Sequence, residues 1–373
     1  MGCFGIYVHI PFCVKKCRYC DFNSGVYGHD LHDRYFDSLI NEISDFGDSH
    51  SICADTVYIG GGTPSSVPVS YIGQVIDALR SSIEVTDDAE ISIEVNPGTM
   101  NRKKAEDYRS LGINRVSIGL QSADDSVLKS LGRIHTVKDF DETFDALRES
   151  GFGNINTDLI YAVPGQTLES LSKTLDHVAK LGPEHISAYS LIIEPGTPLY
   201  DDVDKGIVKP VDEDTDRLMS DMCLQMLRAN GYGRYEISNL SKKGFECRHN
   251  LKYWRRDPYV GFGAGAHSMY GDCRYANVRD VNKYVSCDCN SESEKIYLSE
   301  DECAREQLML GLRLSEGIDT VEFEDMYGID LFEDHPVIVD MVKGGLIEVK
   351  GSRIALTDRG MDIMNSVLIE LGV

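Results

Sequence analysis

Three cysteines near the N-terminus have the residue type and spacing to bind metal. Cys13, Cys17 and Cys20 form the pattern C-x₃-C-x₂-C, and the residues that follow, Asp21 and Phe22, add no fourth thiol. Three thiolates at this spacing can hold three corners of a 4Fe-4S cluster and leave one iron open, where a small molecule can bind and receive an electron. The alternative is a structural or zinc site, but zinc usually takes four ligands from paired motifs. The triplet therefore predicts a cluster with one open iron.

The residues around the triplet carry a family resemblance. The run from Tyr7 to Phe22 reads Tyr-Val-His-Ile-Pro-Phe-Cys-x₃-Cys-x-Tyr-Cys-Asp-Phe. It resembles the opening of radical S-adenosylmethionine (radical SAM) proteins of the coproporphyrinogen dehydrogenase and haem chaperone group. The resemblance covers residues 5–275, with a looser match beyond them. It implies S-adenosylmethionine as a cofactor, and it implies that Tyr7 and Tyr19 contact that cofactor.

A glycine triplet follows the second predicted strand. Gly60, Gly61 and Gly62 precede Thr63 and a proline. Glycines let a backbone approach a ligand closely and present its amide and carbonyl groups. Taken alone, the triplet could equally be a tight turn. The resemblance implies that Gly61, Gly62 and Thr63 belong to the motif that receives the methionine amino group.

Polar residues at the ends of later predicted strands match the same family. S-adenosylmethionine is a zwitterion with a ribose, so a carboxylate can take its ammonium, a guanidinium its carboxylate, and Gln or Asp its hydroxyls. The resemblance implies that Glu94 faces the amino group, Arg133 the carboxylate, and Gln121 and Asp158 the ribose. Each residue alone could be an ordinary surface or capping group.

A second motif, Cys-Arg-His-Asn-Leu-Lys-Tyr-Trp, ends at the only tryptophan of the chain, Trp254. Haem has an iron that accepts an imidazole, a ring that stacks on aromatic side chains and two carboxylates that attract cations. We expect His249 to bind the iron and Tyr253 and Trp254 to contact the ring, with Cys247 as a rival iron ligand. The alternative is that His249 only forms internal hydrogen bonds and Trp254 fills a core. His267 could instead line the cofactor pocket.

The charge around this motif is unusual for the chain. The protein has a net charge of −24, but residues 242–256 carry six basic residues against Glu246 alone. An acidic chain argues against nucleic acid as a partner. The basic segment is suited to the carboxylates of haem.

Two functions share this set of sites. The string His-Asn-x-x-Tyr-Trp resembles the signature of HemW-type haem chaperones, which hand haem to haem-requiring proteins. The alternative is oxygen-independent oxidation of coproporphyrinogen III. That enzyme group carries a further cysteine two residues after the third ligand, where this chain has Phe22, and it lacks the string. Both features favour the chaperone, with haem-accepting proteins as partners. A homodimer and peripheral docking on a membrane protein are left open.

The elements that position these residues alternate regularly. Six predicted strands and intervening helices indicate an α/β fold with a parallel sheet. A doubly wound sheet and a partial barrel both fit, and the resemblance favours an open (β/α)₆ partial barrel of the TIM type. The expected strands are Gly5–Ile10, Thr56–Ile59, Glu90–Val95, Arg115–Ile118, Asn156–Ile160 and His185–Leu191.

We expect three domains. Residues 1–200 would form the barrel with the cluster and S-adenosylmethionine site, residues 201–298 a connecting region with the haem motif, and residues 299–373 a winged-helix-like module. In that module a turn at 350–352 separates two short strands, and Thr357 is the expected N-cap of the following helix. Its acidity argues against DNA and favours a lid or a partner-docking unit.

The expected compartment is the cytoplasm, because the N-terminus lacks the regions of a signal peptide and no apolar run approaches the length of a membrane span. In that setting cysteines are more often thiols or cluster ligands than disulfides. We therefore expect no special role for the cysteines outside the two motifs: Cys3, Cys53, Cys223, Cys273, Cys287, Cys289 and Cys303.

Overall fold

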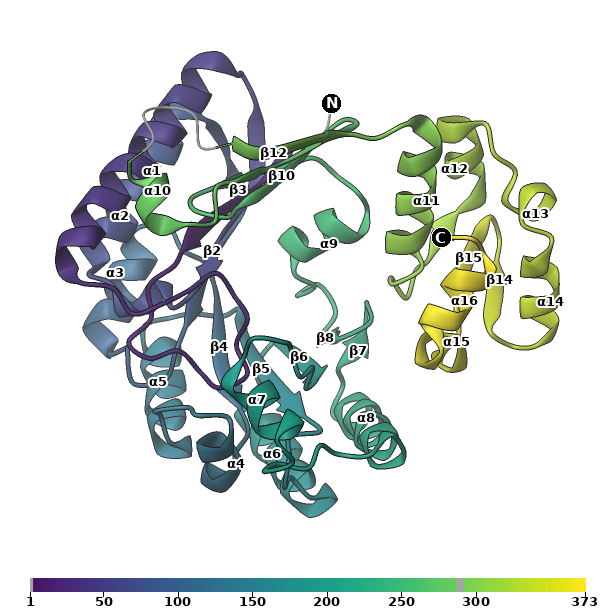
Figure 1. Ribbon diagram of the computed structural model, residues 1–373, viewed down its shortest axis with the longest axis horizontal. Helices are drawn as coiled ribbons and strands as arrows, with labels where there is room; N and C mark the ends of the chain where they lie inside the picture. The colour runs from purple at the N-terminus through teal and green to yellow at the C-terminus, as the bar shows by residue number, and fades with distance from the viewer. Residues whose placement is uncertain (1–2, 287–291) are drawn as a thin grey trace.

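The computed structural model describes residues 3–286 and 292–373. Its centre is a run of six parallel strands that neighbour one another in chain order, as in a barrel that has been left open (Figure 1). The sequence prediction of a parallel sheet with these six strands is confirmed. The strands are β1 (Phe4–Ile10), β2 (Cys53–Gly61), β3 (Glu84–Val95), β4 (Arg115–Gln121), β5 (Ile155–Tyr161) and β6 (His185–Ser190).

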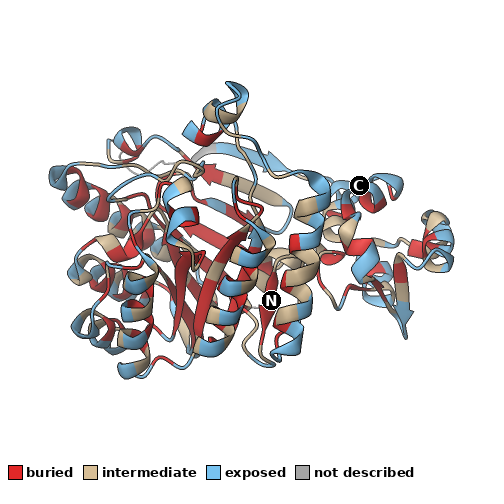
Figure 2. Ribbon diagram, turned by 90° about the horizontal axis from the view of Figure 1, so that it is seen from below, coloured by how far each residue is buried: buried red, intermediate tan, exposed pale blue. Residues whose placement is uncertain are grey.

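Helices on the outer face cover this sheet, and most residues of the strands beneath them are buried (Figures 1 and 2). Helix α5, for example, begins at a capping box made by Thr136 and Asp139 and buries Phe140 and Phe144. No helix within the described ranges is long and apolar enough to cross a membrane. The outer helices are α1 (His29–Ser49), α2 (Val69–Ser82), α3 (Arg102–Ser110), α4 (Asp125–Ser130), α5 (Val137–Glu149) and α6 (Leu168–Leu181).

The sheet continues past both ends of the six strands. Beyond β6 it adds β8 (Asn239–Ser241) and β7 (Gly233–Arg234); beyond β1 it adds β9 (Tyr259–Phe262), which runs parallel to β1. Residues of the expected connecting region thus extend the barrel sheet, and the three domain boundaries stay a prediction. The remaining elements here are β10 (His267–Tyr270), β11 (Cys273–Asn277), β12 (Glu292–Tyr297), α7 (Pro198–Asp204), α8 (Glu213–Ala229), α9 (Arg248–Trp254) and α10 (Val281–Tyr284).

The C-terminal part forms a module with its own hydrophobic core, separate from that of the barrel (Figure 1). Helices precede a hairpin whose strands pair with a third short strand, the arrangement of a winged helix. Thr357 caps the next helix by accepting a hydrogen bond from Gly360 N, as expected. Its elements are α11 (Glu300–Gly311), β13 (Ile318–Asp319), α12 (Thr320–Tyr327), α13 (Leu331–Asp334), α14 (Val337–Lys343), β14 (Ile347–Lys350), β15 (Arg353–Leu356), α15 (Asp358–Asp362) and α16 (Met364–Glu370).

One expectation about the cysteines is wrong. Cys3 and Cys53 form a disulfide, with their Cα atoms 4.9 Å apart. The pairing of β1 with β2 places these residues side by side, although 50 positions separate them in the chain. Cys287 and Cys289 lie outside the described residues.

Candidate functional site

A cavity of about 130 Å³ lies where the carboxyl ends of the barrel strands meet the cysteine loop. Parallel strands bring their carboxyl ends to one edge, so residues far apart in the sequence converge there. Tyr7 is absent from the lining. The predicted site residues that line the cavity are Cys13, Cys17, Tyr19, Cys20, Gly61, Gly62, Thr63, Glu94, Gln121, Arg133 and Asp158.

The cysteine loop presents three half-buried free thiols to this cavity. The amide of Cys13 donates to Gly25 O at 2.8 Å, and Thr63 Oγ1 lies 3.5 Å from Cys13 Sγ. Within the described residues, no three His, Cys, Asp or Glu side chains come close enough together to hold one metal ion. In a cluster each thiolate binds a different iron, so the three cysteines need not converge on a single point.

Among the residues that the structure describes, no Lys, Arg or His forms an ion pair with Glu94, although Arg115 lies near enough to affect its pKa. Glu94 accepts hydrogen bonds from Gly61 N at 3.0 Å and from the Tyr58 hydroxyl at 3.1 Å. Burial raises the pKa of Glu94 to about 7, and the nearby carboxylate of Asp158 raises it further in the same direction. An ammonium group in the cavity would supply the missing positive charge. This carboxylate fits the amino group of S-adenosylmethionine.

Asp158 and Gln121 lie on the neighbouring strands β5 and β4. Asp158 accepts hydrogen bonds from Ser117 Oγ at 3.0 Å and Asn156 Nδ2 at 2.7 Å, and burial raises its pKa. Gln121 has a φ of +70°, a left-handed conformation that costs a non-glycine residue free energy and that clusters at functional sites. Both side chains can offer polar atoms to a ribose.

Arg133 is turned toward the cysteine loop. Its Nη1 donates to Cys17 Sγ at 3.6 Å, while Nη2 donates to Asn96 Oδ1 at 2.7 Å and to Gly119 O at 2.9 Å. The guanidinium thus lies beside a candidate cluster ligand, where a cation favours a thiolate. The sequence analysis missed Asn96 as a site residue. The sequence did contain a signal for Asn96, because it comes two residues after Glu94, immediately beyond the end of β3.

Gly62 shows how closely the glycine loop packs on the cysteine loop. A Cβ at Gly62 would lie 2.8 Å from Phe12 O and 3.0 Å from Cys13 Sγ. Gly61 has a φ of +117°, which only glycine adopts readily. Both positions therefore require glycine, and the donor set around them suits a cluster with a bound zwitterion.

Tyr7 lies one layer behind the cavity. His9 Nε2 donates to Asn23 O at 2.8 Å, so His9 Nδ1 accepts from the Tyr7 hydroxyl at 3.0 Å. The Tyr7 ring stacks on Tyr58, the residue that holds Glu94. In this structure Tyr7 supports the cavity wall without lining it, and its predicted contact with the cofactor stays a prediction.

The second motif forms helix α9, which contacts β2 on one side and α11 on the other (Figure 1). His249 is 1 % exposed, and both of its ring nitrogens are engaged: Nδ1 lies 2.9 Å from Thr56 Oγ1 and Nε2 lies 2.8 Å from the Tyr253 hydroxyl. Burial lowers its pKa to about 3, and the nearby cations Lys252 and Arg115 contribute in the same direction. His249 is therefore neutral and closed off from any iron unless α9 moves.

Cys247 precedes α9 and is fully buried. Its thiol donates to Glu90 at 3.6 Å, and burial raises its pKa to about 12. The same carboxylate accepts from the amides of Arg248 and His249, both at 3.3 Å, so Glu90 on strand β3 satisfies backbone donors in the first turn of α9, much as a capping side chain would. Glu90 was missed by the sequence analysis, which had no means of pairing it with residues more than 150 positions away.

The basic segment is largely neutralised inside the fold. Arg248 and Lys252 both pair with Asp55, at 3.5 and 2.8 Å. These pairs hold α9 against β2 and leave less positive charge for a ligand. The other ion pairs of this segment are Lys242–Glu184, Arg248–Asp88, Arg255–Glu316 and Arg256–Glu306.

Two further predicted residues, Tyr253 and Trp254, lie on α9, and a third, His267, lies apart from it. The Trp254 ring faces the Arg313 guanidinium at 5.6 Å. Tyr253 packs edge-on against Tyr259. His267 is exposed on β10 and does not line the cavity. The structure thus brings His249, Tyr253 and Trp254 together on one short helix and leaves His267 outside both sites.

Known proteins share this architecture along the whole chain. The Radical SAM superfamily model matches residues 7–178, and the HemN C-terminal domain model matches residues 298–363. The heme chaperone HemW of Bacillus subtilis is 36% identical over 372 residues, covering 97% of this chain and 97% of that protein. This chain belongs to the HemW family of radical SAM proteins.

Further relatives agree. The heme chaperone HemW of Escherichia coli is 34% identical, covering 97% of this chain and 96% of its own. Among solved structures, the coproporphyrinogen III oxidase HemN of Escherichia coli superposes with a TM-score of 0.86 at 25% identity, covering 99% of this chain and 90% of that one. The expected fold and family are confirmed, and the fold is common to chaperone and enzyme.

Proposed function

We propose that this chain is a haem chaperone that binds haem and delivers it to haem-requiring proteins. The observation that carries the proposal is its identity to heme chaperones over nearly the entire length of both chains. The cysteine loop supports it, because Phe22, 63 % exposed at the cavity, stands where the dehydrogenases carry a further cysteine.

We further propose that the cavity is the cofactor site of this chaperone. Cys13, Cys17 and Cys20 would hold the cluster, with Arg133 beside one of the thiols. Glu94 and the Gly61–Thr63 loop would receive the amino group of S-adenosylmethionine, and Gln121 and Asp158 the ribose. When bound, the cluster supplies an open iron for the cofactor and a store for one electron.

Haem, as the cargo, would bind at α9 after the helix moves outward. His249 would then lose its hydrogen bonds to Thr56 and Tyr253 and could reach iron, with Tyr253 and Trp254 next to the ring. The same movement would break the pairs of Lys252 and Arg248 with Asp55 and free two cations for the haem carboxylates.

The oxidation of coproporphyrinogen III is the second candidate, because the solved HemN structure matches almost all of the chain. Two assays on the reconstituted protein separate the functions. The chaperone should bind one haem per chain with a shifted Soret band and leave coproporphyrinogen III unchanged under anaerobic reducing conditions with S-adenosylmethionine. Turnover of coproporphyrinogen III would overturn the proposal.

Haem-accepting proteins are the proposed partners, and the acidic C-terminal module is the proposed docking unit. Transfer of haem from the loaded protein to an apo-protein that needs haem would be followed by the change in absorbance. Size-exclusion chromatography of the same samples would show whether the chaperone works as a homodimer.

A further inference from the structure

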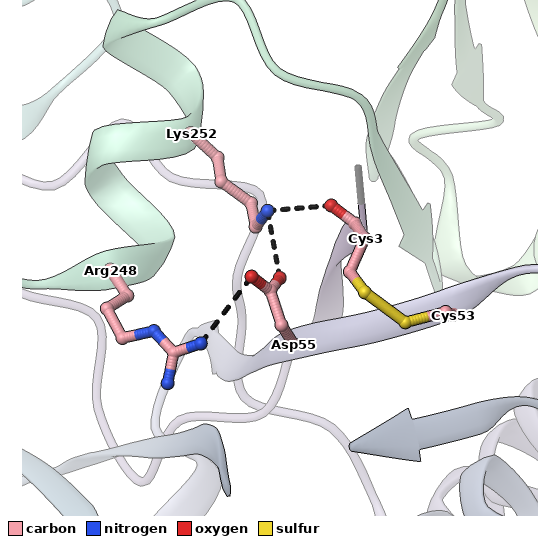
Figure 3. The surroundings of a disulfide bond; sticks show 5 residues. All are labelled: Cys3, Cys53, Asp55, Arg248 and Lys252. Atoms are coloured by element: carbon pink, nitrogen blue, oxygen red, sulfur yellow. Dashed lines mark hydrogen bonds and ion pairs between the residues drawn. A yellow bond between two sulfur atoms is a disulfide. The ribbon is translucent and has the colours of Figure 1, made fainter. Parts of the chain in front are cut away.

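The disulfide lies beside the helix that carries the haem motif, and Lys252 connects the two. Lys252 Nζ donates to the backbone carbonyl of Cys3 at 2.7 Å and pairs with Asp55 Oδ1 at 2.8 Å (Figure 3). Asp55 is two residues from Cys53, the other half of the disulfide. Both half-cystines are therefore next to the atoms that anchor the side of α9 facing β2.

The disulfide holds Cys3 where strand pairing does not. The paired register of β1 with β2 begins at Phe4, which faces Ala54, and Cys3 precedes the strand. The link to Cys53 therefore restrains the carbonyl that receives the Lys252 ammonium. The Lys252 side chain is only 9% exposed, so a loss of this acceptor would leave a largely buried cation with less compensation.

A disulfide is unexpected in this chain. The cluster loop needs free thiols at Cys13, Cys17 and Cys20, and all three are free in the structure. Where such thiols persist, a disulfide is usually transient or redox-sensing, not permanent. A disulfide between Cys3 and Cys53 beside such thiols is of the kind expected to be reversible.

We propose that Cys3 and Cys53 form a thiol–disulfide site that holds α9 in its closed position. The oxidant is a low-molecular-weight disulfide of the glutathione type. One protein thiolate attacks it and releases one small thiol; the second protein thiolate then attacks the mixed disulfide and releases the other. The protein pair loses two electrons and two protons, and two small thiols are formed. Reduction by two small thiols reverses both steps.

The consequence for haem rests on the proposed function. With the disulfide formed, Cys3 keeps Lys252 in place and His249 stays buried behind α9. When the pair is reduced to two thiols, the Cys3 carbonyl is no longer restrained by the bond to Cys53. Helix α9 then moves outward more often, and haem can reach His249. The reduced protein should therefore bind haem faster than the oxidised protein.

The single tryptophan makes this testable without haem. Trp254 is the last residue of α9, so quenching of its fluorescence by acrylamide reports on the exposure of that helix. Cluster-loaded protein would be equilibrated anaerobically in reduced or oxidised glutathione, and thiols would be counted by alkylation and mass. We expect two fewer reactive thiols in the oxidised protein, and a Stern–Volmer constant about twofold higher in the reduced protein.

Two variants complete the test. Cys53→Ser should show the high quenching constant in both buffers. Lys252→Met keeps the cysteine pair but removes the ammonium group that anchors α9. Its two cysteines should still oxidise and reduce as in the wild type, while its quenching constant should stay high in both buffers. Equal quenching of reduced and oxidised wild type, with the two thiols shown to interconvert, would overturn the proposal. So would a Cys3–Cys53 pair that never oxidises. Failure of haem binding alone would count against the proposed function instead.

Discussion

His249 Nε2 lies 2.8 Å from the hydroxyl of Tyr253, one turn later on the same helix. Two residues of the haem motif thus satisfy each other in the closed structure, and Thr56 takes the remaining ring nitrogen at 2.9 Å. In the closed structure His249, the candidate iron ligand, is therefore buried and both of its ring nitrogens are hydrogen-bonded. Haem binding has to replace these bonds.

Tyr253→Phe should strengthen haem binding. The change removes one of the two hydrogen bonds that compete with iron for His249, and one such bond contributes about 0.5–1.5 kcal/mol, or roughly twofold to twelvefold in affinity. The dissociation constant would be measured by Soret titration. Tyr259→Phe is the control, since it removes a hydroxyl from the neighbouring ring without touching His249.

His249→Ala completes that comparison. If His249 binds the iron, this variant should shift the Soret band and weaken binding in both the wild-type and the Tyr253→Phe background. Unchanged spectra in both backgrounds would show that another residue is the ligand. Cys247 is a poor substitute in the closed structure, because burial keeps its thiol protonated.

Binding of S-adenosylmethionine should depend on pH through Glu94. Its pKa is raised to about 7, so it holds its proton below that pH and is ionised above it. Only the ionised form attracts an ammonium group, so affinity should rise with pH by up to tenfold per unit and level off above about 7. Calorimetry on the cluster-loaded protein between about pH 5.5 and about pH 8.5, a range that brackets this pKa, would measure the change.

Glu94→Gln is the matched variant for that experiment. The amide keeps the shape of the side chain: its oxygen can still accept from Gly61 N, and its NH2 can donate to the Tyr58 hydroxyl, which then accepts instead of donating. We expect weaker binding that no longer changes with pH near 7. A variant that keeps the wild-type pH profile would assign the titration to another group, of which Asp158 is the nearest carboxylate with a raised pKa.

Cys17→Ser should abolish most of the cluster absorbance of the reconstituted protein. Two thiolates hold a cluster poorly, and the substitution also removes the sulfur that Arg133 contacts. Iron and sulfide content would be measured beside the visible spectrum. Cys273→Ser is the control, because Cys273 is a free thiol on β11, outside the cluster loop. Full cluster content in Cys17→Ser would mean that the triplet is not the ligand set.

Glu90→Ala should destabilise the protein by about 2 kcal/mol, because it leaves buried donors at the start of α9 without an acceptor. The urea midpoint would be measured together with Trp254 fluorescence, which reports on α9 itself. Glu84→Ala on the same strand is the control, since Glu84 is exposed. An equal midpoint for both variants would show that Glu90 does not cap the helix.

The sequence was sufficient for features that depend on local spacing. Strands and helices differ in the spacing of the apolar residues that they bury, so their alternation can be read from the sequence. That alternation predicts the parallel sheet. The short intervals between Cys13, Cys17 and Cys20 predict a shared loop. The ends of parallel strands meet at one edge, and Glu94, Gln121 and Asp158 accordingly line one cavity.

The tertiary structure decided what depends on partners distant in the chain. Lys252 and Arg248 looked like free cations, but both pair with Asp55. His249 looked like an available ligand, but Thr56 and Tyr253 bond its two ring nitrogens. Residue type and spacing set which chemistry a side chain can perform. Whether that chemistry is open to a ligand depends on burial and on charges brought close by folding, and neither is a local property of the sequence.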